Sequence, residues 1–152
     1  MKLERVITMK IETQCLHAGY TPGNGEPLTL PIYQSTTYKY ESTAQVAKLF
    51  DLTADGHMYS RISNPTVAAV EAKIAALEGG VGALCTTSGQ AASLISVLNI
   101  LSCGDHILCT STIYGGTINL FAVTLKRFGI EVSFVDADAS EEELKKQLRP
   151  NT

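Results

Sequence analysis

Residues 87–90, Thr-Ser-Gly-Gln, have the types and spacing of an anion site. They follow a short apolar run and precede a helical pattern, so the N–H groups of Gly89 and Gln90 are expected at a helix start, without partners inside the helix. Glycine lets a ligand approach the backbone closely, and free N–H groups at a helix N-terminus attract negative charge. A phosphate is the ligand favoured here. In the alternative interpretation, Ser88 is only an ordinary helix cap.

Tyr114 is a second candidate, in the loop that follows the next apolar run. Ligands of open α/β sheets collect at the carboxyl ends of the strands, so this ring is expected beside the anion site. A planar ring there could stack on a flat cofactor, and its hydroxyl could exchange protons. In the alternative interpretation, the ring only packs against its own loop.

Tyr59 and Arg61 are a third set of candidates, just before a predicted helix. Side chains of an extended segment alternate, so these two point the same way if the segment is extended. The guanidinium fork of an arginine beside a tyrosine hydroxyl is a good phosphate clamp. In the alternative interpretation, Arg61 forms an ion pair on the surface.

From residue 64 onward, helical patterns alternate with short apolar runs. Asn64 is a good N-cap, Pro65 a good first helical residue and Gly79 a good helix end. Strands are predicted over 81–86, 106–110 and 130–135. Further helices are predicted from Ser88 to about Leu101, from Gly116 to near Gly129, and from Ser140. In the helix that begins at Ser88, the residues Leu94, Leu98 and Leu101 are expected to face inward. This alternation predicts an α/β fold with a mostly parallel sheet and crossover helices.

The first 63 residues have a different composition. Gly19–Pro31 holds three prolines and three glycines in thirteen residues, which favours an extended arm. A short helix is predicted over 42–52, capped by Ser42. Val46, Leu49 and Phe50 are expected on one face of this helix. We therefore predict an arm with short helices over 1–63, lying on another part of the molecule or on a neighbouring subunit, and a domain over 64–152.

The composition excludes several classes of protein. With 152 residues, 45% hydrophobic and 18% charged, the chain can bury a core and is not disordered. A net charge of -3 from mixed acidic and basic residues does not indicate a nucleic-acid partner or a membrane surface. No apolar run approaches the roughly 20 residues of a membrane span, and no signal-peptide core is evident. These features predict a cytoplasmic protein.

The cysteines and histidines do not predict a metal site. The 4 cysteines form no C-x-x-C pair, and three lie in apolar stretches, so buried and reduced thiols are expected. The 3 histidines share no i, i+4 spacing and pair with no nearby cysteine.

Six blocks of the sequence match, in order, the motifs of one enzyme family. They are Thr13–Gly19, Pro31–Tyr38, Tyr59–Thr66, Leu77–Gly80, Ser88–Ala92 and Tyr114–Thr117. The chain thus resembles the Cys/Met metabolism family of pyridoxal-phosphate enzymes. The resemblance implies pyridoxal 5'-phosphate as cofactor and the fold type I architecture of the aspartate aminotransferase kind. The chain would form the N-terminal arm and an incomplete first part of the cofactor-binding large domain.

The resemblance also implies roles for the candidate residues. The hydroxyl of Ser88 and the amides of Gly89 and Gln90 would neighbour the cofactor phosphate. Tyr114 would stack on the pyridine ring and transfer a proton near the leaving group. Tyr59 and Arg61 would reach the phosphate in the adjacent subunit's site, so a homo-oligomer is implied, a homotetramer built as a dimer of active dimers.

Within the family, residues 114–121 are most similar to the O-acetylhomoserine sulfhydrylase branch. That branch implies gamma-replacement, in which sulfide takes the place of acetate on an amino-acid substrate and L-homocysteine is formed. Methionine gamma-lyase, where a cysteine usually stands at the position of Gly116, and cystathionine gamma-synthase or lyase remain alternatives. A stand-alone α/β binding module is the alternative that is not an enzyme.

The family's Schiff-base lysine, in a Ser-x-x-Lys or Ser-x-Thr-Lys setting, has no counterpart here. None of the eight lysines in the sequence stands in such a setting. We therefore expect the chain to be about the first third of the enzyme and to be inactive alone.

Overall fold

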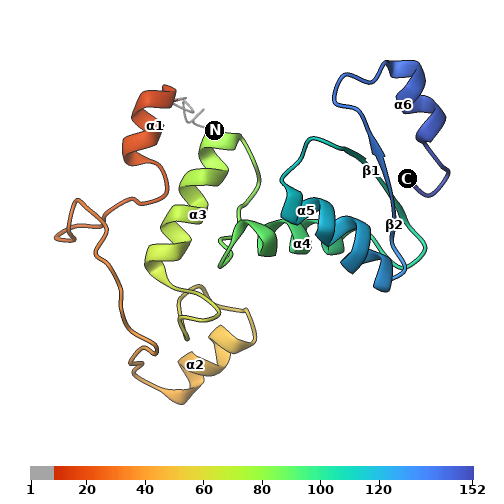
Figure 1. Cartoon of the computed structure of the whole chain (residues 1–152). Helices are drawn as coiled ribbons and strands as arrows, with labels where there is room; N and C mark the ends of the chain where they lie inside the picture. The colour runs from red at the N-terminus through yellow and green to blue at the C-terminus, as the bar shows by residue number, and fades with distance from the viewer. Residues whose placement is uncertain (1–8) are drawn as a thin grey trace, which may run out of the picture. The chain divides into compact units, whose positions relative to one another are not determined.

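The computed structural model describes residues 9–152 and divides into two compact units, Met1–Cys85 and Thr86–Thr152 (Figure 1). The first unit contains α1 (Ile11–His17), α2 (Thr43–Phe50) and α3 (Pro65–Glu78). The second contains α4 (Gly89–Ile100), β1 (His106–Thr110), α5 (Gly115–Asn119), the π-helical turn η1 (Leu120–Leu125), β2 (Glu131–Val135) and α6 (Glu141–Gln147). The division into an arm over 1–63 and a domain over 64–152 stays a prediction.

The predicted helix starts at Ser42, Asn64, Ser88 and Ser140 are confirmed, and a polar side chain caps each of them. Ser42, Asn64 and Ser88 accept hydrogen bonds from backbone N–H groups in the first turns of α2, α3 and α4. Ser140 and Glu143 form the reciprocal capping box at the start of α6. At the other end of α3, Gly79 adopts the left-handed conformation, with φ of 65°.

In the first unit, α1 packs against α3, and the arm that follows α1 approaches α3 closely. Gly19 has φ of +87°, and a Cβ there would collide with the backbone carbonyl oxygen of Ala69. A glycine is therefore required at this approach. Lys73 of α3 donates from Nζ to the carbonyl oxygens of Cys15 and Leu16 at 3.1 and 3.3 Å, which places a cation at the C-terminal end of α1.

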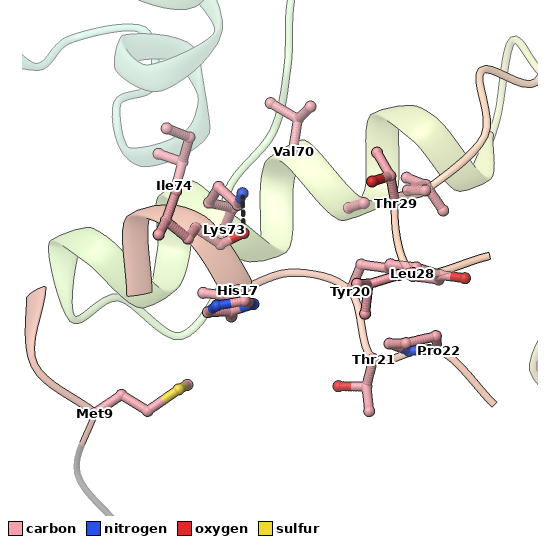
Figure 2. Close-up of a pocket in the computed structure, with 14 residues that line it drawn as sticks. Met9, His17, Tyr20, Thr21, Pro22, Leu28, Thr29, Val70, Lys73 and Ile74 are labelled. Carbon is pink, nitrogen blue, oxygen red and sulfur yellow. Dashed lines mark hydrogen bonds between the residues drawn. The ribbon is translucent and has the colours of Figure 1, made fainter. Parts of the chain in front are cut away.

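Figure 2 shows a pocket of this unit, formed where α1 and the arm lie along α3. Its volume is about 690 Å³, and its apolar lining includes Leu16, Leu28, Val70 and Ile74. None of the predicted site residues lines this pocket. The candidate chemistry of the chain is therefore elsewhere.

The second unit is built on a parallel pair of strands, as the alternating pattern predicts. β1 and β2 pair in register from His106 with Glu131 to Thr110 with Val135. The buried core consists of Phe121, Leu125 and Ile130. Residues of α4, of the segment just after it and of both strands pack against this core, namely Leu94, Val97, Leu101, Ile107, Cys109, Val132 and Phe134. One face of the sheet thereby packs against the core residues of η1, and the segment that links β1 to β2 is helical, as expected of a crossover connection.

Three expectations from the sequence are wrong. Residues 81–86 form no strand in the part of the chain described, and Val81 is fully exposed. A strand exists only where its backbone pairs with a neighbour, which an apolar run does not provide by itself. Leu98, predicted to face inward, is 41% exposed. Cys15, Cys85 and Cys103 are exposed thiols, and Cys109 is half-buried.

Within residues 9–152, no helix is long and apolar enough to cross a bilayer. The same residues contain no group of three or more His, Cys, Asp or Glu side chains arranged to hold a metal ion.

His106 is a fully buried polar residue at the start of β1. Its Nδ1 lies 2.8 Å from Oγ1 of Thr152, and its Nε2 lies 2.9 Å from Oγ of Ser133 on β2. Burial lowers the pKa of His106 below its ordinary value of 6.5, the Arg149 guanidinium lowers it further, and Glu131 opposes them. The neutral imidazole is therefore the form that the folded chain stabilises.

We expect this histidine to make the protein less stable in mild acid. Because the pKa of His106 is lower in the folded state, the unfolded state binds the proton first as the pH falls below about 6.5. The contribution of His106 to stability is complete above that pH and is lost as the pH falls toward its folded pKa. Thermal unfolding midpoints of the wild type and His106→Gln, measured from pH 7.5 to 5, should show a smaller decline in the variant. Equal declines would contradict this prediction.

Candidate functional site

The start of α4 presents the predicted anion-binding groups. Ser88 caps the helix, with its Oγ accepting from the N–H of Ala91 at 3.1 Å, and its carbonyl oxygen accepts from the N–H of Ala92 at 3.0 Å. The N–H groups of Gly89 and Gln90 precede these two and have no acceptor inside the helix. A Cβ on Gly89 would meet no atom within 4 Å, so the space on the Cβ side of Gly89 is open.

Tyr114 lies immediately before α5, and this residue is 75% exposed. Gly116 explains where its ring lies, since a Cβ on Gly116 would be 2.5 Å from Cε1 of Tyr114 and 2.8 Å from Nε2 of Gln90. The ring of Tyr114 and the side chain of Gln90 therefore meet over the same glycine. The hydroxyl of Thr117 donates to Oε1 of Gln90 at 3.0 Å, which joins the first turns of α4 and α5.

Tyr59 and Arg61 lie together in the first unit, although not on an extended strand. Tyr59 forms an isolated antiparallel bridge with Thr37, and the chain then turns, with the N–H groups of Ile62 and Ser63 both donating to the carbonyl oxygen of Tyr59. The turn brings the guanidinium of Arg61 over the Tyr59 ring, 5.2 Å from its centroid. This is a cation–π contact, and the side chain of Arg61 is exposed. Arg61 forms no ion pair among the described residues, so the surface-pair alternative is not supported.

The structure thus gathers the predicted residues into two groups. Ser88, Gly89, Gln90 and Tyr114 lie together in the second unit, and Tyr59 and Arg61 lie together in the first. Gly116 and Thr117 also belong to the second group, although their contacts were not predicted from the sequence. The Gly-Gly-Thr that follows Tyr114 is visible in the sequence, but its contacts to Gln90 follow only from the position of α4 next to α5.

The chemistry of both groups suits a phosphorylated aromatic molecule. Backbone N–H groups, a guanidinium and a tyrosine hydroxyl are donors to a phosphate, and no carboxylate belongs to either group. An exposed tyrosine ring beside the N–H groups of α4 offers a face for stacking. The residues present therefore fit pyridoxal 5'-phosphate.

The family model described as Cys/Met metabolism PLP-dependent enzyme matches residues 12–152. The chain belongs to this family. The expected α/β fold of PLP-dependent enzymes is confirmed, because a solved O-acetylhomoserine (thiol)-lyase from Campylobacter jejuni, with N'-pyridoxyl-lysine-5'-monophosphate in its structure, superposes with a TM-score of 0.84. That structure is 38% identical in sequence, and the match covers 95% of this chain and 35% of that one.

Curated relatives in the Cys/Met metabolism family include sulfhydrylases and a lyase. O-acetyl-L-homoserine sulfhydrylase 1 of Thermus thermophilus is 49% identical over 139 residues, which is 89% of this chain and 32% of that protein. L-methionine gamma-lyase of Fusobacterium nucleatum is 40% identical over 140 residues, 92% of this chain and 35% of that protein. The chain therefore spans about a third of the length of the relatives it matches.

A matched pair of glycine variants tests the arrangement around Tyr114. In Gly116→Ala the new methyl group must displace the Tyr114 ring and the Gln90 side chain, whereas a Cβ on Gly115 meets nothing within 4 Å. Because only side chains have to move, and alanine favours a helix by up to about 1 kcal/mol over glycine, neither variant should unfold more easily. Crystal structures should show the ring moved in Gly116→Ala alone. An unmoved ring there would contradict the geometry.

Proposed function

We propose that the protein containing this chain is an O-acetyl-L-homoserine sulfhydrylase that uses pyridoxal 5'-phosphate. Its reaction would be gamma-replacement, in which sulfide displaces acetate from the gamma carbon of the substrate and L-homocysteine is formed. The observation that carries this proposal is the 49% identity to a sulfhydrylase over 89% of the chain. The group of donors beside an exposed aromatic ring supports the choice of cofactor.

In this proposal the first turn of α4 binds the phosphate. The N–H groups of Gly89 and Gln90 would donate to phosphate oxygens, with the Ser88 hydroxyl nearby, and the helix N-terminus would favour the negative charge. Tyr114 would stack on the pyridine ring and move a proton near the leaving group. When bound, the cofactor supplies an electron sink for cleavage of bonds next to the amino-acid alpha carbon, while the protein supplies position and charge.

Tyr59 and Arg61 would complete the phosphate site in a neighbouring copy of the chain. The exposure of Arg61 and its position over the Tyr59 ring support a role toward a ligand outside their own unit, since the guanidinium forms no ion pair with any of residues 9–152. We therefore propose a homo-oligomer built from dimers that share sites, as a homotetramer. Location in the cytoplasm stays a prediction from the sequence.

Methionine gamma-lyase is the second candidate function, supported by the 40% identity to the enzyme of Fusobacterium nucleatum. This enzyme would use the same cofactor-binding residues, but it would eliminate methanethiol from methionine instead of exchanging acetate for sulfide. Cystathionine gamma-synthase and cystathionine lyase are related alternatives. They differ in the sulfur compound that is added or released.

The test uses protein expressed from the complete gene and loaded with pyridoxal 5'-phosphate. With O-acetyl-L-homoserine and sulfide, we expect L-homocysteine and one acetate per turnover, measured by chromatography. With L-methionine alone, we expect little methanethiol, and with cysteine as the nucleophile little cystathionine. Faster release of methanethiol would favour the lyase, and no reaction with any of these substrates in cofactor-loaded protein would overturn the assignment to an enzyme of this type.

A further inference from the structure

Asn64 is a buried polar residue just after the Tyr59–Arg61 turn, and its side chain does more than cap α3. Its Oδ1 accepts the capping hydrogen bond from the N–H of Thr66 at 2.9 Å. Its Nδ2 faces three acceptors, namely the carbonyl oxygen of Tyr33 at 2.9 Å, Oγ of Ser60 at 2.9 Å and the hydroxyl oxygen of Tyr38 at 3.3 Å. Capping of α3 explains only the contact of Oδ1 with the N–H of Thr66.

The direction of the hydrogen bonds around Ser60 follows from its partners. The hydroxyl of Ser60 donates to the carbonyl oxygen of Ser35, so its proton is already used. The Tyr38 hydroxyl, 3.1 Å from Oγ of Ser60, must then be the donor of that pair. Both hydroxyl oxygens are therefore left as acceptors for the amide of Asn64. Only a hydrogen-bond donor satisfies this position.

These contacts surround the turn that carries the guanidinium. Ser60 stands between Tyr59 and Arg61 and is anchored to the segment 35–38 by its side chain and by its N–H, which donates to the carbonyl oxygen of Thr36 at 2.9 Å. Tyr59 is bridged to Thr37 in the same segment. The amide of Asn64 joins this segment, the turn and the start of α3 at one buried point.

We propose that Asn64 is a positioning residue, whose amide N–H groups fix the Ser60 turn so that Arg61 and Tyr59 are held ready for the cofactor phosphate. The inference rests on the proposed function, because the phosphate contact of Arg61 belongs to it. It adds a requirement that capping does not impose, namely a donor at Nδ2.

Asn64→Asp separates the two roles of this side chain. Aspartate is as good an N-cap as asparagine, so the contact to Thr66 is kept. A carboxylate oxygen in place of Nδ2 would face the carbonyl oxygen of Tyr33, which cannot donate, and two hydroxyl groups whose protons are used elsewhere. The turn should therefore shift while α3 keeps its start. Asn24→Asp makes the same change of charge on an exposed residue of the same unit and is the control.

The experiment measures dissociation constants for pyridoxal 5'-phosphate and for pyridoxal, which lacks the phosphate, on the protein from the complete gene freed of cofactor. Asn64→Asp should weaken binding of the phosphorylated form by about tenfold, with pyridoxal and the Asn24→Asp control changed less than about twofold. In an Arg61→Ala background, Asn64→Asp should add less than about a further twofold, because residues that act through one contact are not additive.

The outcomes separate this inference from the function beneath it. If Arg61→Ala weakens phosphate-dependent binding but Asn64→Asp does not, the positioning role is overturned and the proposed site stands. The positioning role is also overturned if Asn64→Asp weakens the binding of pyridoxal as much as that of pyridoxal 5'-phosphate, or if its effect is fully additive with that of Arg61→Ala. In either case Asn64 would act on general stability. If Arg61→Ala itself has no effect, the phosphate contact fails and the inference fails with it.

Ser60→Ala is a second variant for the case in which Asn64→Asp does not fold. It removes the hydroxyl that accepts from Asn64 and donates to Ser35 without placing a charge in a buried site. We expect the affinity for pyridoxal 5'-phosphate to fall by about threefold to fivefold. The affinity for pyridoxal should not change, and Ser60→Ala should have no further effect in the Arg61→Ala background. Binding equal to the wild type would overturn the inference.

Discussion

Replacing Leu125 with alanine should destabilise the protein by about 2 to 5 kcal/mol, which is the usual cost of a cavity at a fully buried leucine. Leu125 ends η1 with no exposed surface and packs in the core with Phe121 and Ile130. Its carbonyl oxygen also accepts from the N–H groups of Phe128 and Ile130, which begins the turn into β2. The neighbours are therefore held by backbone contacts and cannot easily fill the space.

The measurement is denaturant-induced unfolding followed by circular dichroism, with Leu98→Ala as the matched control. Leu98 lies on α4 but is 41% exposed, so its truncation should cost clearly less, about 1 kcal/mol or below. An equal loss of stability in the two variants would mean that Leu98 is buried to the same extent as Leu125. This result would contradict the difference in burial between the two residues.

Replacing Arg61 with alanine should weaken the binding of pyridoxal 5'-phosphate by about 1.5 to 3 kcal/mol, or roughly ten- to a hundredfold, if the guanidinium makes a charge-assisted contact to the phosphate. The side chain is exposed and stacks on Tyr59, so its removal should change the stability of the fold by less than about 0.5 kcal/mol. Affinity and stability should thus respond differently.

Arg61→Lys is the control for charge. Lysine keeps the positive charge but loses the planar fork, so it should recover only part of the affinity. Titration of the cofactor-free protein, followed by the absorbance of the bound cofactor, gives the three dissociation constants. Unchanged affinity in Arg61→Ala would remove this residue from the proposed site.

Helix starts could be predicted from the sequence because their causes are local. Ser42, Ser88 and Ser140 each cap a backbone N–H group within three residues. Only the neighbouring side chain and the chain direction matter for such a contact, so the printed order of residues is sufficient. The parallel pairing of β1 with β2 was also predictable, since a helical connection between two short apolar runs favours it.

Exposure could not be predicted in the same way. Leu98 occupies a position where periodicity indicates an inward face, yet it is 41% exposed. Residues 81–86 have the composition of a strand but pair with none among the described residues. In each case the outcome depends on a surface or backbone supplied by a distant part of a protein, and periodicity records only that one face is apolar.

The sequence by itself determined the family, the fold class and the identity of the candidate site residues, because short motifs carry these and their order is visible in the chain. The tertiary structure alone decided how they meet. Gln90 and Tyr114 share the space above Gly116, and Asn64 reaches back 31 residues to the carbonyl oxygen of Tyr33. Contacts of this kind join segments that are remote in sequence, so their partners are set by how the chain folds back on itself, which local propensity does not encode.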